Sequence, residues 1–140
     1  MAIFRLLTLA FGAGAFGACI LALAHLLLAA LQVPELVGLP PPEPQPILPL
    51  FYRAVVWGGL WGLLLVVPVM NRWWWLKGAL IGVLATLAIL LYFNPGIFTP
   101  PMRFVYALVL NMIWGAAAGF WWALVSGTRK NGRKFGTFMR

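Results

Sequence analysis

Four long apolar stretches dominate the pattern of hydrophobic and polar positions along this chain. They cover residues 4–33, 51–70, 76–93 and 104–126, the third being the shortest, and each contains few charged side chains. A helix needs about 20 mostly apolar residues to cross a hydrocarbon layer of roughly 30 Å. The pattern therefore predicts an all-α integral membrane protein, in which four transmembrane helices form a bundle.

The segments between and after these stretches are too short for a separate soluble domain. The longest connection, residues 34–49, contains seven prolines. Because proline fixes its own φ and disfavours helix at the preceding residue, we expect an extended, largely polyproline II segment. This Pro-rich loop either spaces two helices apart or offers a docking strip to another subunit. Residues 127–140 form a basic tail.

Basic residues set the predicted orientation, because they favour the cytoplasmic side in short loops. Arg5 stands near the N-terminus, Arg72 and Lys77 flank the second connection, and the tail is basic. Four spans put all three places on one side, so we expect both termini in the cytoplasm and the Pro-rich loop outside. Arg53 and Arg103 begin helices at the outer surface, where long side chains snorkel to the head groups. The expected location is the inner (plasma) membrane.

Composition agrees with a membrane protein and narrows the partners. The chain is 64% hydrophobic and 9% charged, whereas soluble domains have about 25% charged residues. Its net charge of +8 does not indicate nucleic-acid binding, because half of the basic residues lie in the tail without a folded module around them. Basic clusters that follow a span contact anionic lipid head groups. The predicted contacts are Arg129, Lys130, Arg133 and Lys134.

Small residues predict where the helices pack. Each stretch carries small residues four positions apart, a spacing that lets two helix backbones approach closely. Trp57, Gly58 and Gly62 match Trp114, Gly115 and Gly119 at a constant offset of 57, which fits a duplicated helical hairpin. The predicted packing glycines are Gly14, Gly17, Gly58, Gly62, Gly78, Gly82, Gly115 and Gly119.

Tryptophans cluster at the predicted inner ends of the helices. Trp and Tyr favour both membrane interfaces, so these residues are expected to anchor the bundle. Helical geometry spreads three consecutive side chains around the axis, and at least one of the first three is expected to face protein or a cofactor. The predicted anchors are Trp73, Trp74, Trp75, Trp121 and Trp122.

Polar side chains within the apolar stretches are the candidate functional residues, because such groups are costly inside a membrane. His25, Thr86 and Asn111 each fall roughly 10 to 12 Å below the outer surface at 1.5 Å per residue. With Arg53 they predict one polar layer. His25 also lies on a face of small residues that suits a neighbouring helix or the flat ring of a tetrapyrrole, a haem or chlorophyll-type pigment, with His25 as axial ligand. We favour helix packing.

The chain offers no set of residues for catalysis. Its two acidic residues, Glu35 and Glu43, both stand in the Pro-rich loop, and it has one histidine and one cysteine. These residues supply neither an acid–base pair in a helix nor the several ligands of a metal site. We therefore expect no enzymatic activity.

Two classes of function remain. In the first, the protein is a non-catalytic accessory or assembly subunit that packs laterally, through its Gly- and Trp-rich helix faces, against other membrane protein subunits. In the second, it is a small oligomeric permease or channel for a neutral or anionic solute, and the polar layer lines the path. We expect the first.

Overall fold

The computed structural model describes residues 2–40, 46–93 and 101–126, and this part of the chain is helical without strands. Four helical segments are long and apolar enough to cross a membrane: Ile3–Ala30, Ile47–Val66, Asn71–Tyr92 and Pro101–Val125. In chain order the elements are α1 (Ala2–Ala30), α2 (Val33–Leu36), α3 (Ile47–Gly62), the 3₁₀ turns η1 (Leu63–Val66) and η2 (Asn71–Trp73), α4 (Trp74–Ala88), the π-helical η3 (Ile89–Phe93) and α5 (Pro101–Val125).

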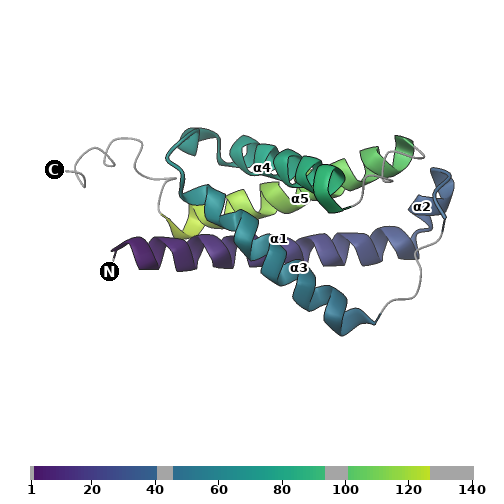
Figure 1. Cartoon of the computed structure of the whole chain (residues 1–140), viewed down its shortest axis with the longest axis horizontal. Coiled ribbons are helices and arrows are strands. Elements are labelled where there is room, and N and C mark those ends of the chain that lie inside the picture. Colours follow the sequence, from purple (N-terminus) through teal and green to yellow (C-terminus); the bar gives the residue numbers. More distant parts are fainter. Residues whose placement is uncertain (1, 41–45, 94–100, 127–140) are drawn as a thin grey trace.

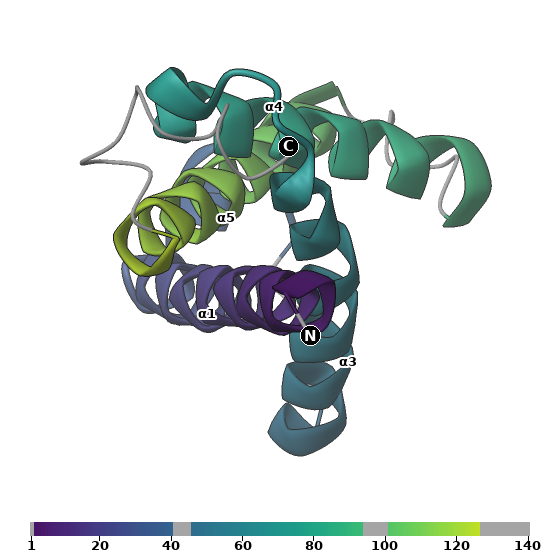
Figure 2. The ribbon, with the colours of Figure 1, turned by 90° about the vertical axis from the view of Figure 1, so that its left-hand side faces the viewer.

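Helices α1 and α5 form the centre of the bundle. α1 packs extensively against α3 and α5, and α5 packs against α1 and α4. Figure 1 shows α1 running the length of the molecule with α3 crossing it. Although α3 and α4 are consecutive in the chain, they leave the central pair in different directions (Figure 2), and α4 contacts the end of the α3 segment at η1. The packing order is therefore α3, α1, α5, α4.

The second span ends earlier than the sequence predicts. Regular helix stops at Gly62, η1 ends at Val66, and Met70 adopts a left-handed conformation with φ 57°. Pro68 explains the break, because its ring lacks an N–H donor and forces Val67 into an extended conformation, with ψ 126°. The predicted boundary at residue 70 is wrong for this reason.

The Pro-rich loop also differs from the prediction at both ends. Val33–Leu36 is helical, and α3 already begins at Ile47, so an extended chain throughout residues 34–49 is wrong. Pro34 and Pro49 each lie in the first turn of a helix, where no N–H donor is required and the φ of proline is suitable. Residues 41–45 lie outside the described part of the chain, as do the predicted lipid contacts Arg129, Lys130, Arg133 and Lys134.

The core consists mostly of small side chains, because the helix backbones lie close together. Four larger side chains, Leu65, Ile81, Trp114 and Trp122, are buried among alanines of α1, α4 and α5. The buried polar side chains of the described residues are Lys77 and Thr86.

Candidate functional site: a tryptophan-lined cleft

Glycines line the contact between α1 and α3. A Cβ atom at Gly14 would overlap the carbonyl oxygen of Gly58, and one at Gly62 would lie 2.6 Å from the carbonyl oxygen of Ala10. On the other side of Gly58, a Cβ would meet the methyl group of Ala18 at 2.8 Å. Because most of these neighbours are backbone atoms, they cannot move aside as a side chain would. The two helices are therefore held at backbone contact.

The contact between α4 and α5 repeats this arrangement. A Cβ atom at Gly78 would overlap the carbonyl oxygen of Gly115, and one at Gly119 would overlap the carbonyl oxygen of Trp74. Gly78 and Trp74 of α4 correspond to Gly14 and Ala10 of α1, at an offset of 64 residues. Gly115 and Gly119 of α5 correspond to Gly58 and Gly62 of α3, at an offset of 57 residues. The hairpins α1–α3 and α4–α5 thus share one packing register, and Gly82 likewise faces the carbonyl of Asn111.

Trp114 joins the two hairpins. Its side chain is buried, and its Nε1 donates a hydrogen bond of 2.9 Å to the carbonyl oxygen of Gly14. Gly17 faces the backbone of Trp114 as well, and a Cβ at Gly58 would lie 3.0 Å from its Nε1. Three helices therefore meet at this one indole group. The WG sequence marks a packing face, but the sequence does not reveal that the indole crosses to α1.

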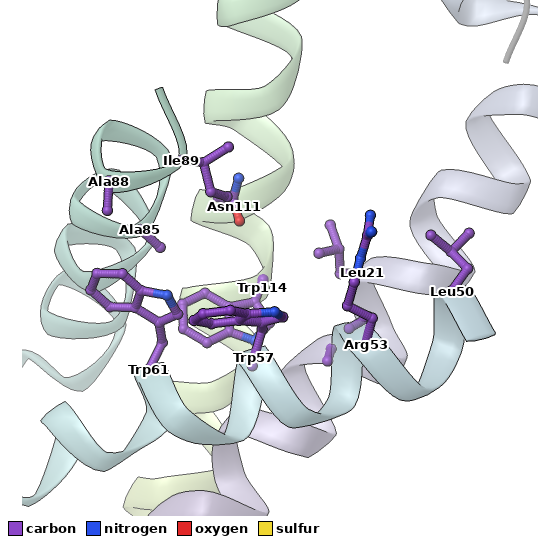
Figure 3. A pocket seen from close by; sticks show the side chains of 13 residues that line it. Leu21, Leu50, Arg53, Trp57, Trp61, Ala85, Ala88, Ile89, Asn111 and Trp114 are labelled. Atoms are coloured by element: carbon purple, nitrogen blue, oxygen red, sulfur yellow. The ribbon is translucent and has the colours of Figure 1, made fainter. Parts of the chain in front are cut away.

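A cleft of about 700 Å³ opens beside this junction (Figure 3). Its floor comes from α1 and α5, and its walls come from α3 and from α4 with η3. Trp57 and Trp61 project from α3 toward Trp114, and Ala85 and Ala88 of α4 lie opposite them. The remaining lining residues are Ala18, Leu21, Leu50, Arg53, Ala54, Gly58, Ile89, Asn111 and Trp114.

Two of the four residues of the predicted polar layer line the cleft, namely Arg53 and Asn111. The Asn111 amide nitrogen donates to the carbonyl of Ala107 at 3.0 Å, and the Thr86 hydroxyl donates to the carbonyl of Gly82 at 2.9 Å. Both hydrogen bonds stay within the residue's own helix. The side chains of Asn111 and Thr86 therefore do not link the helices of the predicted polar layer through these hydrogen bonds.

His25 lies away from the cleft lining, in contact with Tyr106. The two ring centroids are 6.2 Å apart in an edge-on arrangement. The hydroxyl of Tyr106 is buried and has no hydrogen-bond partner within the described residues. The sequence predicts that the α1 face around His25 packs against either a helix or the flat ring of a tetrapyrrole. In the structure, Tyr106 of α5 lies beside His25 on this face.

The predicted tryptophan anchors fall into two groups. Trp73 and Trp75 are exposed, whereas Trp74 packs on Phe120 with ring centroids 5.5 Å apart. Trp121 stacks on Phe16 at 4.6 Å while remaining partly exposed. Trp122 is only 5% exposed, so its indole packs inside the bundle, and its role as an interfacial anchor stays a prediction. The close approach of α5 to its neighbours at Gly115 and Gly119 draws this side chain into the core.

Lys77, which the sequence predicts only as a charge beside the second connection, has a structural role in the bundle. It is 7% exposed, and its Nζ donates to the carbonyls of Leu65 and Val67 at 2.7 and 2.5 Å and to Oδ1 of Asn71 at 3.0 Å. These carbonyls have lost their helical partners because of the break at Pro68. The available sequence signal is a lysine nine residues after Pro68, in the first turn of the next helix. Lys77 fixes α4 to the end of the α3 segment.

No protein-family model, curated protein or solved structure matches this chain. The four apolar helices define a multi-pass membrane protein.

Proposed function

We propose that this chain is a non-catalytic accessory or assembly subunit of a larger membrane complex, which it joins laterally through α3. The observation that carries the proposal is the way in which α3 is held. The buried residues of α3 are three glycines, Gly58, Gly59 and Gly62. Every large side chain between Ile47 and Gly62 remains at least partly exposed.

One face of α3 is suited to a partner helix. Tyr52, Val56 and Leu60 recur at every fourth position and are 64%, 49% and 46% exposed, so they form one stripe along the helix. We call this stripe the α3 outer face. Within a membrane, helices associate by van der Waals packing rather than by removal from water. The α3 outer face, with one aromatic and two aliphatic side chains, is available for such packing.

The chemistry of the cleft supports a non-catalytic role. Its lining contains one titratable side chain, Arg53, which supplies neither a general base nor a nucleophile at neutral pH. The described residues also bring no three His, Cys, Asp or Glu side chains together.

Site-specific photo-crosslinking in the membranes of the native host tests the proposal. A photoreactive residue at Val56 samples the α3 outer face, and one at Leu84 of α4, which is similarly exposed at 53%, is the control. We expect Val56 to give a discrete crosslink to another membrane polypeptide and Leu84 to give none. A crosslink from Val56 to a second copy of the chain would instead favour the oligomeric permease or channel. Equal crosslinking from both positions would refute a specific lateral interface.

A further inference from the structure

We propose that the cleft binds one anionic phospholipid, with the phosphate at Arg53 and one acyl chain between α3 and α4. This site is distinct from the α3 outer face and requires no partner subunit. It rests on three features of the described residues, namely the size of the cleft, its apolar lining and the one cation at its edge.

The cleft is too small to enclose a transmembrane helix. A helix about 10 Å in diameter would fill the cleft's 700 Å³ within about 9 Å of its length, roughly six residues. Cavities of about 300–1,000 Å³ accommodate molecules of small-ligand size. An acyl chain is narrower than a helix and flexible, so it can follow the space between two diverging helices.

The lining suits an acyl chain along most of its length. Ala18 and Leu21 of α1 form part of the floor, and Ala85, Ala88 and Ile89 form the α4 side. The aromatic faces of Trp57 and Trp61 close the α3 side (Figure 3). None of these groups offers a charge, and flat indole faces pack well against methylene groups.

Arg53 supplies the charge at the edge of this apolar surface. It lies six residues after the start of α3, about 9 Å along the helix axis, within the span Ile47–Val66. Its side chain is exposed and makes no hydrogen bond or ion pair within the described part of the chain. A charged group inside a membrane is expensive unless it is paired, and guanidinium matches the geometry of phosphate oxygens.

A second, smaller hollow continues from the cleft at this point. Pro46, Pro49, Leu50 and Arg53 line it, with a volume of about 130 Å³. Leu50 and Arg53 belong to both hollows. Arg53 therefore stands where a ligand would pass from an apolar channel to the end of the bundle at which α3 begins, as a head group above its acyl chain would.

Because acyl chains of different phospholipids are alike, selection must come from the head group. The test is native mass spectrometry of the delipidated full chain, given equal amounts of phosphatidylglycerol and phosphatidylcholine with identical acyl chains. We expect one phosphatidylglycerol per chain, retained about tenfold over phosphatidylcholine, which corresponds to one charge-assisted contact.

Three variants locate the site. Arg53→Gln should abolish the preference, whereas Arg103→Gln, which removes the same charge from the first turn of α5 and outside the cleft, should preserve it. Ala88→Trp fills the cleft and should reduce retention of both lipids, with helicity measured by circular dichroism to verify folding.

Several outcomes would overturn the proposal. Equal retention of the two lipids by the native chain would remove head-group recognition, even if Arg53→Gln failed to fold. Preserved preference in Arg53→Gln would move the charge contact elsewhere. Displacement of phosphatidylglycerol by inorganic phosphate alone would indicate a simple anion site, and preferential retention of oleate would indicate a fatty acid as the occupant. None of these results depends on a partner subunit, so the proposed function is tested separately.

Discussion

Replacing Gly14 by alanine tests the backbone contact on which the bundle depends. The added Cβ would overlap the carbonyl oxygen of Gly58 and lie 2.8 Å from the Cα of Gly62. Both neighbours are backbone atoms, so α1 and α3 must move apart where they cross. Such a shift would also disturb the hydrogen bond from Trp114 to the Gly14 carbonyl.

The expected cost follows from these two effects. Overpacking in a well-packed core costs about 1–3 kcal/mol, and loss of an interhelical hydrogen bond in a membrane protein costs about 0.6–1 kcal/mol more. Gly12→Ala is the matched control, because a Cβ at Gly12 meets nothing within 4 Å and the gain in helix propensity is the same for both variants. The free energy of unfolding should therefore be about 2–4 kcal/mol lower for Gly14→Ala than for Gly12→Ala.

Reversible unfolding in mixed micelles, followed by far-UV circular dichroism at increasing mole fraction of sodium dodecyl sulfate, measures this difference. Tryptophan fluorescence should shift in the same transition, because Trp114 lies at the junction. Identical transition midpoints for the two alanine variants would refute the reasoning, since the helices would then tolerate a methyl group at their closest approach.

Three further predictions concern other parts of the chain. Lys77→Met should lower the free energy of unfolding by about 2–4 kcal/mol in the same assay, because it leaves two carbonyls without a donor. Arg72→Gln, at an exposed side chain, is the control and should change the free energy of unfolding little. Equal effects of the two variants would refute the role of Lys77 as the donor to these carbonyls. Tyr106→Phe should be neutral or stabilising by up to about 1 kcal/mol, because the hydroxyl is buried without a partner in the described residues. A clear loss of stability would show instead that this hydroxyl makes a hydrogen bond. In a Cys19→Ser background, an impermeant thiol reagent applied to intact cells should label Glu43→Cys and spare Gly132→Cys, as the distribution of basic residues predicts; the reverse pattern would invert the topology.

The spans were predictable from the sequence because the requirement of about 20 apolar residues is imposed by the membrane itself. The residues at which the spans end were less predictable. Pro68 lies within an apolar run, and hydropathy alone gives it no special weight, yet it ends the regular structure after Val66. The prolines at 34 and 49 predict extended chain by their general preference, although the first turn of a helix also accepts proline.

The site was predictable only in part, because it depends on how helices cross. Glycine spacing identifies the side of a helix that can approach a neighbour, but not which neighbour it meets. Arg53 and Asn111 were selected as costly polar groups, and both line the cleft. The tryptophans at 57 and 61 were not selected, because their convergence depends on the divergence of α3 from α4.

The Lys77 clamp has a consequence for the order in which the chain enters the membrane. All three acceptors of its ammonium group lie within the preceding twelve residues. The clamp can therefore close as soon as the first turn of α4 has been synthesised, before any of α5 exists. The ammonium group then enters the membrane already hydrogen-bonded to three oxygen acceptors, which join the end of the α3 segment to the first turn of α4. α5 arrives last, and it completes the bundle by inserting between α1 and α4.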